Sequence, residues 1–67
     1  MYEIRLFLTV SHHPRTWRID DLTTSIDVAK SELAVPGDRA EVWSTTQQRP
    51  AWIGERGYHG QVAESLA

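Results

Sequence analysis

The hydrophobic pattern changes its period along the chain, and this change constrains the fold more than any other feature of the sequence. From residue 2 to residue 10 apolar and polar residues alternate, which is typical of a strand with one buried face. The apolar positions are Tyr2, Ile4, Leu6, Leu8 and Val10. Phe7 is the exception, because it falls on the face that otherwise carries polar side chains.

The stretch SHHPRTWR, residues 11–18, interrupts this alternation and then resumes it. Pro14 cannot donate to a central ladder, so it belongs in a turn or at the start of a strand. Trp17 and Ile19 lie on one side of the resumed pattern, and Thr16 and Arg18 lie on the other. The simplest structure is a hairpin with its loop over residues 11–14.

A helical period follows from Asp20 onward. Apolar residues spaced by four, three and four form one stripe of an α-helix, and they are Leu22, Ile26, Ala29 and Leu33. Asp20, Asp21, Thr23 and Thr24 offer N-caps, so the helix is expected to start between residues 21 and 24. It should end near Ala34, because Val35 precedes a proline. The sequence VPGD then predicts a type II turn.

A second hairpin is expected after this turn. The run RAEVWSTT puts Ala40, Val42 and Ser44 on one face of a strand and Glu41, Trp43 and Thr45 on the other. QQRP is typical of a loop, and AWIGE of a short strand in which Trp52 is opposed to Ala51 and Ile53. Residues 57–67 contain glycines and then QVAESLA, which is compatible with a flexible tail, a frayed helical turn or an edge strand.

Together these elements predict an α+β fold in a small single domain. We expect an antiparallel sheet of about four strands, in the order hairpin, helix, hairpin (ββαββ), with one helix packed on one face. Residues 1–56 form this domain and residues 57–67 its tail. The other sheet face then has no cover, and Phe7 and Trp43 fall on it; Trp52 joins them if Ile53 points inward. Such an aromatic patch usually marks an interaction site. The alternative is that a tryptophan turns inward, because a core this small needs bulk.

Composition limits the function classes. The chain has 67 residues and no cysteine, which excludes disulfides and thiolate metal sites. A domain of this size buries only about 60% of its unfolded surface, so a partner chain is a plausible source of added stability. The net charge of −2 argues against a nucleic-acid binder that relies on counterion release. Glu3 and Arg5 interrupt the first apolar run, so we expect no signal peptide, no membrane association and a cytoplasmic location.

Two clusters are candidate ligand sites. His12, His13 and His59 supply imidazoles for a metal, but adjacent strand residues point to opposite faces and nothing in the spacing selects a site. We therefore assign no metal ligand and no cofactor. Arg15 and Arg18, with Arg5 if the register allows it, could contact an anion. The competing interpretation is that these arginines pair with Glu3, Asp20 or Asp21 at the surface.

No catalytic residue is predicted. The glycines of GERGYHG match neither the dinucleotide fingerprint nor the P-loop. Ser11 with a histidine and an aspartate could be imagined as a triad, but a chain this short offers little volume for a substrate pocket.

The sequence therefore favours a non-enzymatic protein-binding module. Its interface would comprise Phe7, Trp43 and Trp52, and its partner would be another protein or a second copy of itself. Size and an arginine-rich composition suggest a phage- or plasmid-borne modulator of a host protein. The alternative is a single-stranded nucleic-acid-binding module, in which aromatic residues stack on bases and arginines follow the backbone. Those arginines are Arg5, Arg15, Arg18, Arg49 and Arg56.

Overall fold

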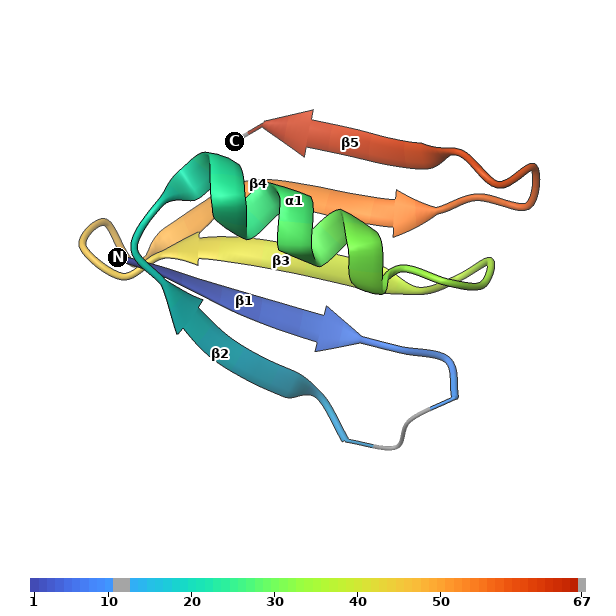
Figure 1. The fold of residues 1–67 in the computed structure, drawn as a ribbon, viewed down its shortest axis with the longest axis horizontal. Helices are drawn as coiled ribbons and strands as arrows, with labels where there is room; N and C mark the ends of the chain where they lie inside the picture. Colours follow the sequence, from blue (N-terminus) through green and yellow to red (C-terminus); the bar gives the residue numbers. More distant parts are fainter. Residues whose placement is uncertain (11–12, 67) are drawn as a thin grey trace.

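A computed structural model describes residues 1–10 and 13–66 and confirms the predicted fold class. One helix packs on an antiparallel sheet with the strand order β2-β1-β3-β4-β5 (Figure 1). In chain order the elements are β1 (Tyr2–Phe7), β2 (Arg15–Ile19), α1 (Leu22–Glu32), β3 (Arg39–Ser44), β4 (Arg49–Arg56) and β5 (Val62–Leu66). The sheet has five strands instead of the expected four, because part of the predicted tail forms the edge strand β5.

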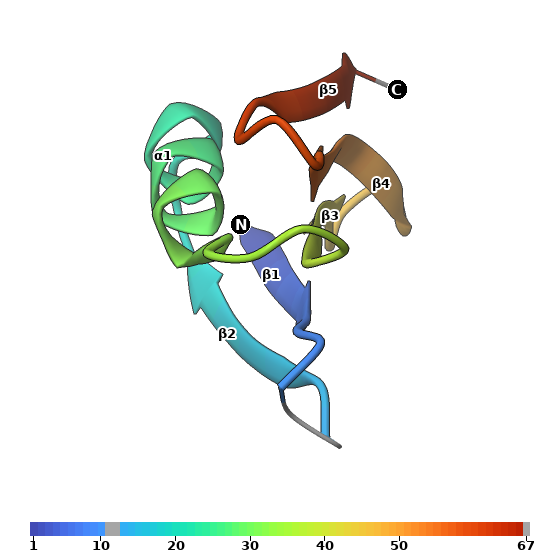
Figure 2. The same cartoon turned by 90° about the vertical axis from the view of Figure 1, so that its right-hand side faces the viewer.

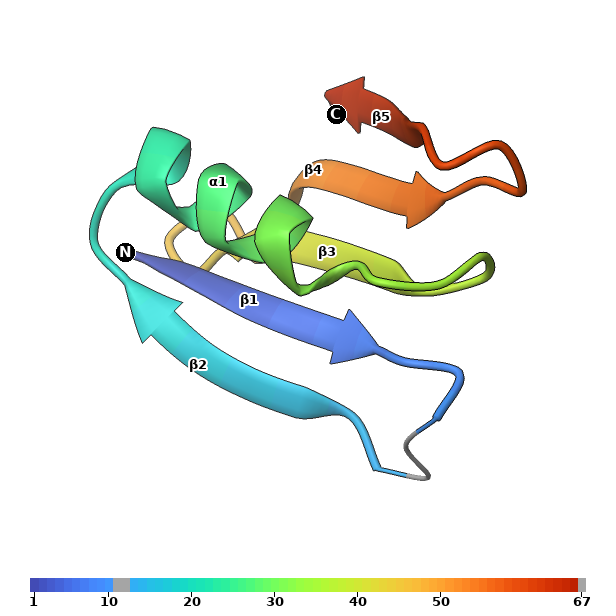
Figure 3. The same cartoon turned by 45° about the vertical axis from the view of Figure 1, so that its right-hand side comes forward.

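The core lies between α1 and one face of the sheet, which we call the inner face. Figure 2 shows α1 on this side of the sheet, and Figure 3 shows β5 at the sheet edge beyond the helix. The faces predicted for β1, β2 and β3 are confirmed within these strands, although β1 ends at Phe7 and the predicted pattern does not continue to Val10, which is 82% exposed. The buried hydrophobic residues are Ile4, Leu6, Ala29, Leu33, Ala40, Val42 and Trp52.

A carboxylate caps the start of α1, and a turn follows its end. At the start, the side chain of Asp21 accepts a hydrogen bond from the backbone N–H of Thr24 at 2.8 Å, which makes Asp21 the N-cap among the candidates considered. After the helix, the backbone N–H of Asp38 donates to Val35 O, and Gly37 between them has a φ of 95°. This geometry is that of the predicted type II turn, which needs a residue without a β-carbon at that position.

The expected orientation of Trp52 was wrong. A bulge in the β3–β4 pairing sets Val42 opposite Trp52 but Trp43 opposite Pro50, so Ala51 is an extra residue in β4. The rest of β4 then presents Trp52 to the inner face, where its side chain is 1% exposed, and Ile53 to the other face. Trp52 belongs to the core and takes no part in an exposed aromatic surface, because it supplies the bulk that a small core needs.

In the described part of the chain, no helix combines the length and the hydrophobicity required to cross a membrane.

Candidate functional site on the outer face of the sheet

The side of the sheet opposite α1, here called the outer face, carries no covering element among the described residues (Figure 2). Its central strands are β1 and β3, flanked by β2 on one side and by β4 and β5 on the other. Strand alternation and register assign to it Glu3, Arg5 and Phe7 of β1, Thr16 and Arg18 of β2, Arg39, Glu41 and Trp43 of β3, Ile53 and Glu55 of β4, and Ala63 and Ser65 of β5.

Charges of opposite sign face each other across the strands of the outer face. Glu3 is opposite Arg18 in the β1–β2 pair. Arg5 is opposite Glu41 in the β1–β3 pair, and Arg39 of β3 is opposite Glu55 of β4. Opposite charges at such positions stabilise a sheet modestly. The outer face is therefore electrically balanced within itself.

Glu3 is the carboxylate that two arginines share. Arg5 Nε donates to Glu3 Oε1 at 2.7 Å, and Arg18 Nε lies 3.6 Å from Glu3 Oε2. The hydrogen bond from Arg5 is the strongest influence on the pKa of Glu3 and lowers it; partial burial opposes this effect and the charge of Arg18 adds to it. The competing interpretation of the sequence, that Arg5 and Arg18 pair with Glu3, is confirmed.

Trp43 is contacted at one face of its ring and at the ring edge. The guanidinium carbon of Arg5 lies 4.1 Å from the centroid of the ring, which is the geometry of a cation–π contact. At the ring edge, Trp43 Nε1 donates to Glu41 Oε1 at 2.7 Å, and Arg39 Nη2 donates to Glu41 Oε2 at 2.7 Å. These contacts fix the orientation of a half-buried indole on a solvent-facing sheet.

Phe7 is the most exposed aromatic side chain of the outer face, with 40% of its surface accessible. A hollow of about 240 Å³ adjoins it, lined by Phe7, Arg39 and Glu41. A second hollow of about 410 Å³ lies toward the other end of β1 and is lined by Glu3, Arg5, Arg18, Trp43, Ser44, Thr45 and Gln48. The outer face thus combines an exposed ring with two shallow depressions bounded by charged groups.

The structure does not bring Arg15 and Arg18, the residues suggested for an anion contact, onto one face. The two residues are three apart in β2, so they lie on opposite faces of the strand: Arg18 on the outer face and Arg15 on the inner. Arg15 instead lies with its guanidinium carbon 5.8 Å from the ring of Trp17. Ser11 of the triad hypothesis and His12 of the metal hypothesis lie outside the described residues.

The structure also shows where the candidate metal ligands and the glycine segment lie. Within residues 1–10 and 13–66, no three histidine, aspartate or glutamate side chains gather as metal ligands would. The glycine segment is the turn of the β4–β5 hairpin, in which Gly57 N–H donates to Gln61 O and Gly60 N–H donates to Gly57 O. His59 is exposed in this turn.

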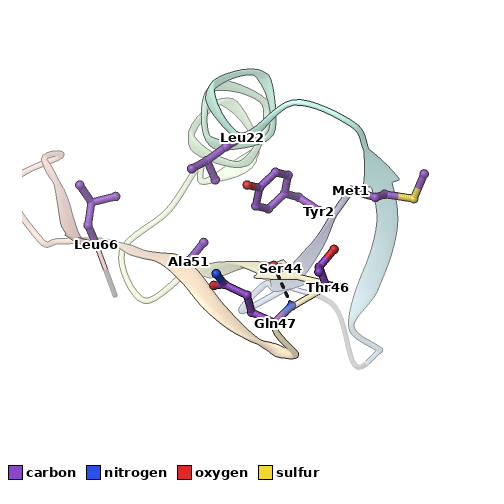
Figure 4. Close-up of a pocket in the computed structure, with 8 residues that line it drawn as sticks. All are labelled: Met1, Tyr2, Leu22, Ser44, Thr46, Gln47, Ala51 and Leu66. Carbon is purple, nitrogen blue, oxygen red and sulfur yellow. Dashed lines mark hydrogen bonds between the residues drawn. The ribbon is translucent and has the colours of Figure 1, made fainter.

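Sequence reasoning missed one cavity, at the open end of the inner face (Figure 4). It has a volume of about 450 Å³ and no charged side chain in its lining, which comprises Met1, Tyr2, Leu22, Ser44, Thr46, Gln47, Ala51 and Leu66. Within it, Gln47 N–H donates to Ser44 Oγ at 3.1 Å. Ala51 enters this lining through the bulge and Leu66 through β5, which the sequence offered only as one of three alternatives for residues 57–67.

Comparison with family models, with curated proteins and with solved structures gives no match. A function for this chain therefore has to be inferred from its own side chains.

Proposed function

We propose that this chain is a non-enzymatic module that binds another protein through the outer face of its sheet. The observation that carries the proposal is the exposed ring of Phe7 at one end of the outer face and an oriented Trp43 toward the other end, on a sheet face that no described element covers. Aromatic residues are enriched at interface hot spots, where they contribute rigid contact area at little entropic cost. The interface predicted from the sequence changes at one residue, because Ile53 and not Trp52 lies on the outer face.

The charge arrangement favours a protein over a nucleic acid as the partner. Arg5, Arg18 and Arg39 each have a carboxylate within 4 Å on the outer face. A nucleic-acid groove needs cations that are free to neutralise phosphates, and these arginines would first have to leave their partners. Paired opposite charges between two aromatic side chains instead resemble the polar groups that fix register in protein interfaces.

Two further arginines that the nucleic-acid alternative uses lie on the inner face of the sheet. Arg56 donates through Nε to Leu33 O at 3.0 Å and through Nη1 to Gly60 O, so it joins α1 to the β4–β5 hairpin on the inner face. Arg15 also lies on the inner side of β2. A single strand of nucleic acid on the outer face would therefore meet few of the five arginines that the sequence offered.

The partner is expected to present an apolar side chain to the hollow beside Phe7. The hollow of about 240 Å³ is bounded by Arg39 and Glu41, which are paired with each other at 2.7 Å. An apolar group placed there would bury the Phe7 ring without breaking that ion pair. Phe7 should therefore carry more of the binding energy than the charged residues around it.

The test is capture of a partner by the tagged chain, with and without nuclease, followed by binding of the purified partner. Phe7→Asp should abolish binding, because it replaces the exposed apolar ring with a charge. Tyr58→Asp is the matched control, since Tyr58 is 90% exposed in the β4–β5 turn and lies off the outer face. In the reconstituted complex, the backbone amides of β1 and β3 should gain protection from hydrogen exchange.

Two results would contradict the proposal. Binding that survives Phe7→Asp in a folded variant would place the interface elsewhere. Binding that disappears with nuclease, or that weakens steeply between low and moderate salt, would favour the nucleic-acid alternative.

A further inference from the structure

The free edge of β5 lacks the features that usually prevent strand-to-strand association. At the opposite edge of the sheet, β2 carries Arg15 and Arg18, and charged side chains of this kind discourage pairing with a further strand. β5 has a single charged residue, Glu64, and its carboxylate is turned toward α1, where Lys30 Nζ lies 2.9 Å from Glu64 Oε1. The described residues supply no strand beyond β5.

The side chains of β5 have a mirror-like order about Glu64. The strand reads Val62, Ala63, Glu64, Ser65, Leu66, which is apolar, small, acidic, small, apolar. When two copies of such a strand run antiparallel about a two-fold axis at Glu64, each residue meets one of its own kind. Val62 of one copy faces Leu66 of the other, and Ala63 faces Ser65. On the inner face this pairing covers Leu66, which is 75% exposed in the single chain.

The backbone hydrogen-bonding pattern of β5 also fits this two-fold pairing. Gly57 N–H donates to Gln61 O in the turn, so these two residues form a hydrogen-bonded pair of the β4–β5 ladder. Because such pairs alternate in an antiparallel ladder, Ala63 and Ser65 direct their backbone groups to β4. Val62, Glu64 and Leu66 then direct theirs to the free edge. These three positions are related to one another by the two-fold axis at Glu64.

The two Glu64 carboxylates at the centre of this pairing would repel each other unless their charges were compensated. Glu64 of one copy lies directly opposite Glu64 of the other, and like charges at such positions are destabilising. Each carboxylate is compensated within its own chain, because Glu64 Oε1 accepts from Trp52 Nε1 at 3.0 Å as well as from Lys30 Nζ. The two lysines therefore neutralise the centre of the pairing.

We propose that β5 pairs antiparallel with β5 of a second copy, about a two-fold axis at Glu64, to form one continuous sheet across two chains. This inference is independent of the outer-face function, since it uses the edge of the sheet and leaves Phe7 and Trp43 accessible. Each copy would also gain cover for apolar surface that a domain of this size lacks the mass to bury alone.

The association is tested by sedimentation of the full chain over a range of concentrations from micromolar to millimolar. The mass should rise from 7.7 kDa toward twice that value. Leu66→Pro should keep the chain at the monomer mass, because it removes an edge N–H that makes no bond to β4. Leu66→Met is the matched control, since it keeps the N–H and the apolar bulk and should still dimerise. A wild-type chain that stays monomeric throughout would overturn the proposal.

The register is tested with single cysteines, which the chain otherwise lacks. Ala63→Cys and Ser65→Cys should form a disulfide with each other when the two variants are mixed and oxidised. Neither variant should cross-link efficiently alone, because position 63 of one copy faces position 65 of the other. Efficient cross-linking of Ala63→Cys with itself would show a different register and overturn the assignment.

Hydrogen exchange supplies an independent readout on the unmodified chain. At high concentration the amides of Val62, Glu64 and Leu66 should gain protection, whereas those of Ala63 and Ser65 should be protected at every concentration. A concentration-dependent gain at Phe7 and Trp43 instead would show that copies associate through the outer face, which would contradict edge pairing.

Discussion

The indole of Trp52 lies in the space that a β-carbon on Gly54 would occupy. The two residues are two apart in β4 and share the inner face, and a β-carbon built at position 54 would be 2.5 Å from Trp52 Cζ2 and closer still to Cη2. The ring therefore lies along its own strand, with Nε1 donating to Glu64 Oε1 of β5 at 3.0 Å. This arrangement leaves room for α1 above the ring and requires glycine beneath it.

Gly54→Ala is expected to destabilise the fold by at least about 1–3 kcal/mol, the usual cost of an added methyl group in a filled core. Trp52 would have to leave its position, and its hydrogen bond to Glu64 would be lost. Gly57→Ala is the control, because the nearest atoms to its added β-carbon belong to the flexible side chain of Gln61, at 3.2 Å. Urea unfolding measures both variants, and equal midpoints would contradict the packing described for Trp52.

This packing also explains which part of the fold could not be predicted from the sequence. In β1 every second residue from Tyr2 onward is apolar, so the two faces of this strand could be assigned correctly. In β4 both phases contain apolar residues, because Trp52 lies between Ala51 and Ile53. The bulge at Ala51 shifts the alternation of β4 against β3. Pro50, directly before it, was one available signal, since proline within a sheet is confined to edge strands, strand starts and bulges, and Gly54 was another, since a strand glycine often marks a close approach.

The candidate site was predictable to a similar extent. Phe7 and Trp43 could be placed on the uncovered face from alternation alone, and the structure puts them there; their role as an interface stays a prediction. The contact between Arg5 and the Trp43 ring depends on the order of the strands, since it forms only because β1 pairs with β3, whereas the bond from Trp43 to Glu41 lies within β3. A sequence pattern gives the faces of each strand but does not give its neighbours.

Asp38→Asn should destabilise the fold by about 1–3 kcal/mol, the cost of leaving buried donors without an acceptor. The Asp38 side chain is buried, and its two oxygens accept from the backbone N–H groups of Thr9, Ala34 and Val35 at 2.9, 2.9 and 3.1 Å. An amide offers only one accepting oxygen. Asp27→Asn, at an exposed position of α1, is the control and should leave the urea midpoint unchanged.

Stability should also fall in acid, and Asp38 should account for part of the fall. Burial raises the pKa of Asp38, but the hydrogen bonds from Thr9, Val35 and Ala34 outweigh it and hold the pKa below the usual 3.8. The unfolded chain then binds the proton first, so this stabilisation is present above about pH 4 and is lost as the pH falls through the folded pKa. Urea titrations from neutral pH downward should show a shallower loss in Asp38→Asn than in the wild type. Parallel curves would contradict this role.

Arg56→Lys should be markedly less stable than the wild type, although the charge is kept. Two nitrogens of the Arg56 guanidinium, Nε and Nη2, donate to Leu33 O at the end of α1, and Nη1 donates to Gly60 O in the hairpin turn. A lysine carries its donors on one nitrogen and cannot reach both carbonyls at once. We therefore expect the free energy of unfolding to fall by about 1 kcal/mol or more. Arg49→Lys, at an exposed position in the same strand, is the matched control. Thermal unfolding that gave the same Tm for both lysine variants would rule out this linking role.

The contact between Arg5 and Trp43 should be measurable as a coupling between the two side chains. The guanidinium lies 4.1 Å from the ring centroid and is held there by Glu3, so the charge is already positioned over the ring. A double-mutant cycle with Arg5→Met and Trp43→Leu should give a coupling free energy of about 0.5–1 kcal/mol. Arg18→Met with Trp43→Leu is the control cycle and should give a value near zero, because Arg18 reaches Glu3 but makes no ring contact. Equal coupling in the two cycles would mean that Arg5 acts through the general charge of the outer face, and the orientation of Trp43 would then rest on Glu41 alone.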